Sequence, residues 1–302
     1  RDPGLVGSLA ENRVNSFYLP DVALPELIQP VGSIGSALAG ARYVVIAVPS
    51  HGVRDVVRQI AGYIESDTTI VSAVKGIEET TLFRMSEVIQ EEVVASCSIV
   101  VLSGPSFAPE VARCLPTAVV VSGDSEDAVA SVQHDFRSRA FRLYASRDTV
   151  GVEVGGALKN VIAIAAGVVE ALGLGHNALS AIITRGLAET TRLACAMGGQ
   201  RETLAGLSGL GDLVLTCTGA LSRNRRLGLE LGQGLALSDI LKATRTVAEG
   251  VRTTQAAIDI GKRLGVELPI TSQMADVLAG RKLPNEAAEQ LMLREQRDER
   301  DG

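Results

Sequence analysis

Residues 153–169, EVGGALKNVIAIAAGVV, place one lysine, Lys159, in an otherwise apolar run. A helix that is apolar on nearly every face is typical of a buried core helix. Lysine is rarely buried unless it is paired or functional, and burial lowers its pKa toward the range useful for acid/base catalysis. The preceding Gly155 and Gly156 would let another backbone or a planar ligand approach closely. The alternative is a lysine that extends from a helix end into water.

The chain after about residue 150 has helical periodicity and no convincing strand. Helices are expected from recurring apolar residues in six segments: Leu179–Met197, Thr203–Leu207, Asn224–Leu231, Leu237–Ala243, Gly250–Leu264 and Met274–Gly280. We therefore expect a helical substrate and catalytic domain over residues 151–302. Its boundary would lie just before the lysine helix, and Lys159 would lie at a seam where clefts form.

The first half alternates short apolar runs with amphipathic stretches of helical period. Five runs predict strands: Tyr43–Val48, Thr69–Val74, Ser98–Leu102, Thr117–Val121 and Phe141–Tyr144. Strands separated by helical stretches indicate βαβ units in a doubly wound sheet. The fold class is α/β, with a Rossmann-like domain over residues 1–150.

Ligands of such sheets bind at the carboxyl ends of the strands. Three predicted strand ends carry polar residues or glycine: Pro49-Ser50, Lys75-Gly76 and Gly104-Pro105-Ser106. A lysine directly after a buried strand could contact an anion or a carbonyl, although a surface lysine in an ordinary loop would look the same. Gly76, which allows a tight turn at this point, favours the functional interpretation.

Composition excludes several classes of function. The 302 residues are 46% hydrophobic and 3% aromatic, with a net charge of −6, which argues against nucleic acid and anionic membranes as partners. The four cysteines and three histidines have no metal-ligand spacing, so no metal site is expected. Scattered cysteines predict reduced thiols in a cytoplasmic protein. The longest apolar stretch is interrupted by Glu170 and is too short to span a bilayer.

Two motifs resemble functional sites but have ordinary structural interpretations. The glycine-rich Gly32–Gly40 segment lacks the full G-x-G-x-x-G pattern and a strand before it, so we interpret it as a small-residue helix. Ser50, His51 and Asp55 could suggest a hydrolase, but no nucleophile elbow is present.

Two neighbouring motifs in the second half suggest a polar site. Asp212, flanked by glycines, begins an apolar helix, where an acid also serves as an ordinary N-cap. Residues 222–226, SRNRR, gather hydroxyl, amide and guanidinium donors at a helix start, which suits a phosphate. The alternative is a solvated basic turn.

These parts together resemble bacterial NAD(P)-dependent glycerol-3-phosphate dehydrogenase along nearly the whole chain. The resemblance is carried by Phe17–Pro20, Val48–Ser50, Lys75–Glu78, Ser103–Ala108, Gly155–Asn160, Thr184–Glu189, Gly209–Leu213, Ser222–Asn224 and Ala248–Gly250. It implies reversible hydride transfer between NAD(P)H and dihydroxyacetone phosphate, which supplies glycerol 3-phosphate for phospholipids. It further implies a homodimer.

The resemblance also implies a role for individual residues. Lys159 matches the catalytic lysine, which exchanges a proton with the substrate. The substrate-binding positions are matched by Lys75, Gly104, Ser106, Lys159, Asp212, Ser222, Arg223 and Asn224. The cofactor-binding positions, for NAD or NADP, are matched by Arg1, Lys75, Ala108, Arg223, Val247 and Glu249.

The sequence departs from the family pattern at its beginning. The first strand and its glycine-rich turn, which would hold the pyrophosphate, do not precede Arg1. We expect their absence to leave two flanking strands without a neighbour and to weaken nucleotide binding. The alternative function is therefore a non-catalytic fragment that cannot bind nucleotide. A 2- or 3-hydroxy-acid dehydrogenase is a weaker alternative, because those substrates need no phosphate site.

Overall fold

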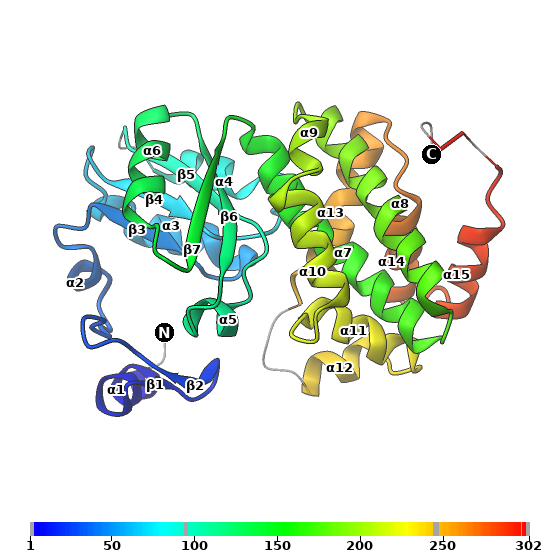
Figure 1. Ribbon diagram of the computed structural model, residues 1–302, viewed down its shortest axis with the longest axis horizontal. Coiled ribbons are helices and arrows are strands. Elements are labelled where there is room, and N and C mark those ends of the chain that lie inside the picture. The colour runs from blue at the N-terminus through cyan, green and yellow to red at the C-terminus, as the bar shows by residue number, and fades with distance from the viewer. Residues whose placement is uncertain (1–2, 94–95, 244–247, 297, 300–302) are drawn as a thin grey trace.

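The computed structural model describes residues 3–93, 96–243, 248–296 and 298–299. An α/β half with a five-stranded sheet lies beside an all-helical half (Figure 1). The α/β half contains α1 (Pro3–Asn12), β1 (Val14–Asn15), β2 (Leu19–Ala23), α2 (Ile34–Leu38), β3 (Tyr43–Ile46), α3 (Val53–Ile60), β4 (Thr69–Ser72), α4 (Met85–Glu92), β5 (Ser98–Ser103), α5 (Ala108–Ala112), β6 (Thr117–Gly123), α6 (Glu126–Asp135) and β7 (Phe141–Ser146).

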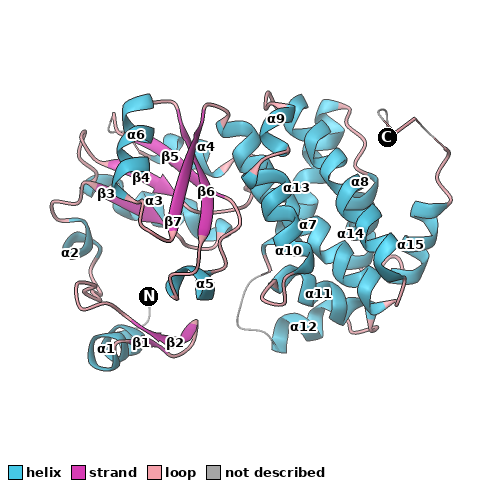
Figure 2. Ribbon diagram, in the orientation of Figure 1, coloured by secondary structure: helices cyan, strands magenta, loops and turns pink. Residues whose placement is uncertain are grey.

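The sheet has the strand order β3-β4-β5-β6-β7 (Figure 2). Helices cover both of its faces. Residues of α3 and α4 pack with Ile46 and Ile70 in one cluster, and residues of α6 pack with Val100 and Val121 in another. The Rossmann-like expectation is therefore confirmed, as are the five predicted strands and the small-residue helix α2.

The sheet is not parallel throughout. Strands β3, β4 and β5 are parallel, but β6 runs antiparallel to β5, while β7 is parallel to β6. A parallel pair needs a crossover connection that spans the sheet. The link from β5 to β6 contains only the short helix α5, so the chain turns back beside β5.

The expected gap in the sheet is also not seen. The described strands are continuous, and β3 and β7 form the two edges. Before the sheet the chain forms α1, which begins at Pro3, a residue type compatible with a first helical turn. The small β1–β2 hairpin was not predicted. The Arg13 side chain holds the loop after it by donating to the Ile28 carbonyl at 2.7 Å.

The helical half is built around α7 (Thr149–Ala171). The surrounding elements are α8 (Gly175–Ala196), α9 (Arg201–Leu204), a π-turn (Leu207–Gly211), α10 (Asp212–Thr218), α11 (Arg223–Gly232), α12 (Leu237–Ala243), α13 (Glu249–Leu264), α14 (Pro269–Leu278) and α15 (Pro284–Met292). Helix α7 packs against α8, α10, α11 and α13. The expectation that this apolar stretch is too short to span a bilayer is wrong, because α7 is long and apolar enough to cross a membrane, yet it is buried inside the protein. Helix α15 has no counterpart among the predicted helices.

Close packing holds α7 against α11. An added Cβ at Gly228 would lie 2.0 Å from the Ile164 carbonyl oxygen, and one at Gly167 would lie 2.0 Å from the Arg225 carbonyl oxygen. Only glycine allows the two backbones to approach this closely. The start of α7 is fixed by Asp148, whose carboxylate accepts hydrogen bonds from the Gly151 and Gln200 amides, both at 2.8 Å.

We predict that Gly228→Ala destabilises the helical half, because the added methyl group would collide with the Ile164 carbonyl. Overpacking typically costs about 1–3 kcal/mol, so the thermal midpoint should fall by roughly 2 °C or more. Gly62→Ala is the matched control, since an added Cβ there meets nothing within 4 Å. Equal midpoints for the two variants in a thermal melt would contradict this account of the α7–α11 contact.

Candidate active site

A buried cluster of two lysines and one aspartate lies where the two halves meet. Asp212, at the start of α10, is 1% exposed. One of its carboxylate oxygens accepts a hydrogen bond from Lys159 Nζ, and the other accepts one from Lys75 Nζ at 2.5 Å. Lys159 also donates to Thr216 Oγ1 at 3.0 Å. Asp212 therefore binds both lysines rather than acting as an ordinary N-cap, and the pairing supports the functional interpretation of both.

The environment of Lys159 changes its acidity. Burial and the nearby charge of Lys75 lower the pKa of Lys159 to about 7, and the attraction of Asp212 opposes this shift. Two cations that share one carboxylate disfavour full protonation. Lys159 can therefore gain and lose a proton near neutral pH, which is what a general acid/base requires.

Glycines let the elements around this cluster approach one another. An added Cβ at Gly156 of α7 would lie 2.7 Å from Ser103 Oγ at the end of β5, and one at Gly155 would lie 2.9 Å from the Ser208 carbonyl oxygen. An added Cβ at Gly76 would lie 2.6 Å from the Cβ of Ser50. The expected close approach at Gly155 and Gly156 is thus made by other parts of this chain.

The loop after β5 lies beside Lys75. Gly104 has a φ of +133°, which favours glycine, and its carbonyl oxygen accepts from Lys75 Nζ at 2.8 Å. The same carbonyl accepts from Ser106 Oγ at 3.1 Å. Gly104 and Ser106 therefore lie next to the lysine cluster, as the sequence predicted. Ala108, the first residue of α5, is exposed.

Asn224 connects α11 to the lysine helix. Its side chain donates to Asn160 Oδ1 at 3.0 Å and accepts from the Gly250 amide at 3.0 Å. Ser222 caps α11 by accepting from the Arg225 amide at 3.2 Å. Both side chains therefore have structural partners, and Asn224 also ties the start of α11 to the residue next to Lys159.

The three arginines near the start of α11 have different partners. Arg225 makes two hydrogen bonds to the Glu170 carboxylate, at 2.7 and 2.9 Å, and Arg226 pairs with Glu230. Arg223 is exposed, and the described residues offer it no hydrogen bond or ion pair. Of the predicted phosphate cluster, Arg223 is thus the guanidinium left for a ligand.

Glu249 makes a further link between the two halves. Its carboxylate accepts from the Ser50 amide at 3.2 Å and from the Ser50 hydroxyl. Ser50 follows β3, and Glu249 begins α13, so the pair joins a strand end to the helical half. Two predicted cofactor residues, Arg1 and Val247, lie outside the described residues.

Sequence reasoning missed Thr216, and it named Ser50 without predicting its contact with Glu249. Thr216 follows Asp212 by four residues in one helix, so both lie on one face, and this spacing could have revealed it. The partner of Ser50 is 199 residues away, and no local signal predicts that contact. Across the described ranges, no group of three or more His, Cys, Asp or Glu is arranged to hold a metal ion.

Family models match both halves of the chain. The C-terminal model of NAD-dependent glycerol-3-phosphate dehydrogenase matches residues 148–289, and the N-terminal model matches residues 1–129. The chain belongs to the NAD-dependent glycerol-3-phosphate dehydrogenase family. A glycerol-3-phosphate dehydrogenase [NAD(P)+] of Koribacter versatilis is 50% identical over 96% of this chain and 87% of that protein. The one from Syntrophotalea carbinolica is also 50% identical, over 98% of this chain and 90% of its own length.

A solved structure supports the same family assignment. The crystal structure of glycerol-3-phosphate dehydrogenase from Coxiella burnetii has a TM-score of 0.93 and 36% identity, and the match covers 97% of this chain and 90% of that one. The dehydrogenase family thus accounts for the order of the two halves, an α/β half followed by a helical one.

Proposed function

We propose that this chain catalyses the reversible reduction of dihydroxyacetone phosphate to glycerol 3-phosphate with NAD(P)H, and so serves phospholipid synthesis. The observation that carries this function is the buried Lys75–Asp212–Lys159 cluster, in which the pKa of Lys159 is lowered to about 7. A steady-state assay of the protein with dihydroxyacetone phosphate and each cofactor tests it directly. Absence of turnover with both NADH and NADPH would contradict it.

Lys159 is the proton donor in the direction of reduction and the proton acceptor in oxidation. The bound nicotinamide supplies or accepts the hydride at the substrate C2. The protonated Lys159 stabilises negative charge that develops on the C2 oxygen and then transfers its proton there. Asp212 orients Lys159, and Lys75 keeps the lysine acidic enough to release the proton. Thr216 fixes the same amine from its other side.

The substrate phosphate binds at the start of α11. The exposed Arg223 supplies a charge-assisted contact, and Ser222 and Asn224 lie at the same helix start. Asn224 is hydrogen-bonded to Asn160, the residue that directly follows Lys159 in α7. This bond ties the phosphate position to the lysine helix. Gly104 and Ser106 line the opposite side, beside Lys75.

A dinucleotide would be held along the carboxyl ends of the strands, where doubly wound sheets usually bind their ligands. Donors and acceptors there fit a dinucleotide: Lys75 and Arg223 are cations, and Glu249 can accept hydrogen bonds from hydroxyl groups. The small side chain of the exposed Ala108 leaves room for the ligand. We also assign Arg1 and Val247 to this site, on the family resemblance alone.

Three further features complete the proposal. The domains are residues 1–150, which bind the nucleotide, and 151–302, which hold the substrate.

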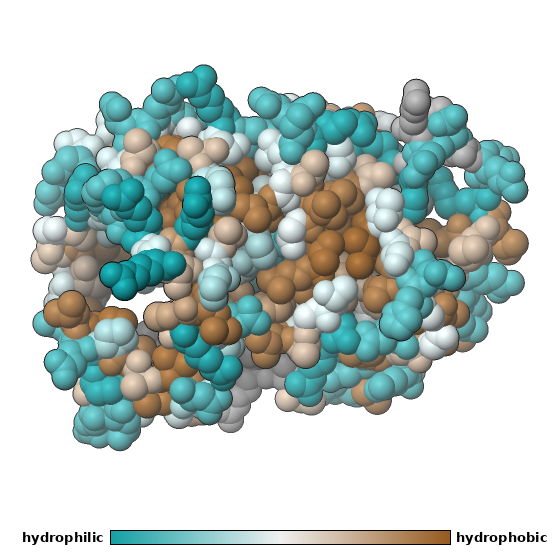
Figure 3. Space-filling view, in the orientation of Figure 1, coloured by the Kyte–Doolittle hydropathy of each residue, from teal (hydrophilic) through white to brown (hydrophobic). Residues whose placement is uncertain are grey.

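The protein works in the cytoplasm, consistent with its free cysteines. It forms a homodimer, for which the apolar side chains gathered on the helical half in Figure 3 offer a surface. A monomer mass in sedimentation velocity would exclude the dimer.

We predict that Lys159→Ala lowers turnover by roughly two to four orders of magnitude, the usual contribution of a general acid/base. The KM for dihydroxyacetone phosphate should change far less. Lys242→Ala, which removes an exposed lysine on α12, is the matched control and should leave turnover unchanged. Near-native turnover of the Lys159→Ala enzyme would remove Lys159 from the mechanism.

We predict that Arg223→Ala weakens binding of dihydroxyacetone phosphate much more than binding of unphosphorylated dihydroxyacetone. The charge-assisted contact exists only with the phosphate and is worth about 1.5–3 kcal/mol, or at least tenfold in affinity. The neighbouring Arg226→Ala is the control, because Arg226 is paired with Glu230. Equal losses for both substrates would show that Arg223 serves the fold or the cofactor instead.

A further inference from the structure

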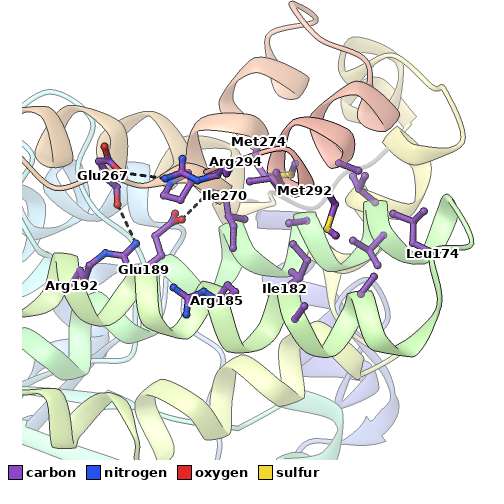
Figure 4. Close-up of a pocket in the computed structure, with 18 of the residues that line it drawn as sticks. Leu174, Ile182, Arg185, Glu189, Arg192, Glu267, Ile270, Met274, Met292 and Arg294 are labelled. Carbon is purple, nitrogen blue, oxygen red and sulfur yellow. Dashed lines mark hydrogen bonds and ion pairs between the residues drawn. The ribbon is translucent and has the colours of Figure 1, made fainter. Parts of the chain in front are cut away.

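A second cavity lies in the helical half, away from the lysine cluster. It encloses about 740 Å³ between α7, α8, α14, α15 and the segment after α15 (Figure 4). This volume is in the range of small-molecule sites. None of the residues that line it belongs to the proposed catalytic, substrate or cofactor set. The proposed dehydrogenase reaction therefore leaves this cavity without a role.

One end of the cavity is apolar. Aliphatic and methionine side chains line it from four helices and the turn after α7, among them Leu291. Figure 4 shows Leu174, Ile182, Met274 and Met292 around this space. Met292 is 86% exposed at the rim. Methionine side chains adapt readily to different apolar ligands. This end is therefore suited to a flexible aliphatic chain.

The other end carries guanidinium groups without carboxylate partners. Arg185 donates only to the Glu299 carbonyl oxygen at 3.2 Å, and Arg192 only to the Glu267 carbonyl oxygen at 3.3 Å. Neither forms an ion pair within the part of the chain that the structure describes. The two side chains point toward one another along α8 (Figure 4). They are seven residues apart and share one face of the helix.

The charges around Arg192 are mixed, because the carboxylates of Glu189 and Glu267 attract it while Arg185 and Arg294 repel it. Glu189, which lies between the two arginines, directs its carboxylate to α14, where it accepts from the Ile270 and Thr271 amides at 2.8 and 2.9 Å. Arg294 pairs with the Glu267 carboxylate at 3.2 Å. The acidic residues of the segment after α15 are exposed, so water and salt screen their charge.

We propose that this cavity binds a fatty carboxylate, with its aliphatic chain in the apolar end and its carboxylate between Arg185 and Arg192. The division into an apolar end and a cationic end matches a single-chain amphiphile with an anionic head. Arginine suits the head group, because its planar donors match a carboxylate. The site is separate from the active site, so it can be tested without substrate or cofactor.

Calorimetric titration of the full chain with octanoate, decanoate and dodecanoate, each below its micelle concentration, tests the apolar end. We expect saturable binding of one molecule per chain. Each pair of added methylene groups should tighten binding by roughly tenfold. Binding that does not saturate, or an affinity that does not rise with chain length, would overturn the proposal.

The cationic end is tested by the double variant Arg185→Gln and Arg192→Gln. It should weaken decanoate binding at least tenfold and leave binding of uncharged 1-decanol unchanged. Arg263→Gln, an exposed arginine on α13, is the matched control and should bind decanoate normally. Equal decanoate affinities for the double variant and the control would refute the head-group assignment. A dimer that excludes decanoate would show that a second copy of the chain occupies the cavity instead.

Discussion

The buried pairing of Lys75 and Lys159 with Asp212 is the interaction on which the rest of the structure depends. Each partner comes from a different part of the chain: a strand end, the central helix and the start of α10. Burial of Lys159 and the charge of the partly exposed Lys75 together outweigh the attraction of the one carboxylate, so Lys159 is easier to deprotonate. The same contact joins the α/β half to the helical half. Chemistry and domain arrangement therefore share one set of atoms.

Maintaining that cluster requires close packing around α7. Gly155 and Gly156 admit the π-turn and the end of β5, while Gly167 admits α11, so the helix is enclosed along its length. A second buried ion pair, between Arg84 and Glu153, fastens α4 to the start of α7. Burial raises the pKa of Glu153, which shows how strongly water is excluded there. That exclusion of water is also what makes Lys159 acidic.

Much of this arrangement was predictable from the sequence because its signals are local. Three features were found where they were expected. They are the buried helix around Lys159, the strands of continuous apolar residues, and the lysine after β4. Long-range or context-dependent features were not predictable. The reversal of β6 depends on how the loop after β5 packs, and the Ser50–Glu249 contact joins residues 199 apart. The arginines near α11 looked equivalent in sequence, but the ion pairs of Arg225 and Arg226 depend on where Glu170 and Glu230 lie.

The most direct test of the account is the pKa of Lys159 itself. The chain has five lysines, so an NMR titration of protein with ¹³C-labelled lysine side chains would resolve each one. We expect one resonance to titrate near pH 7, in accord with the lowered pKa of about 7, and to be missing from the Lys159→Arg variant. If no lysine resonance titrates near pH 7, Lys159 is not the acidic lysine on which this mechanism depends.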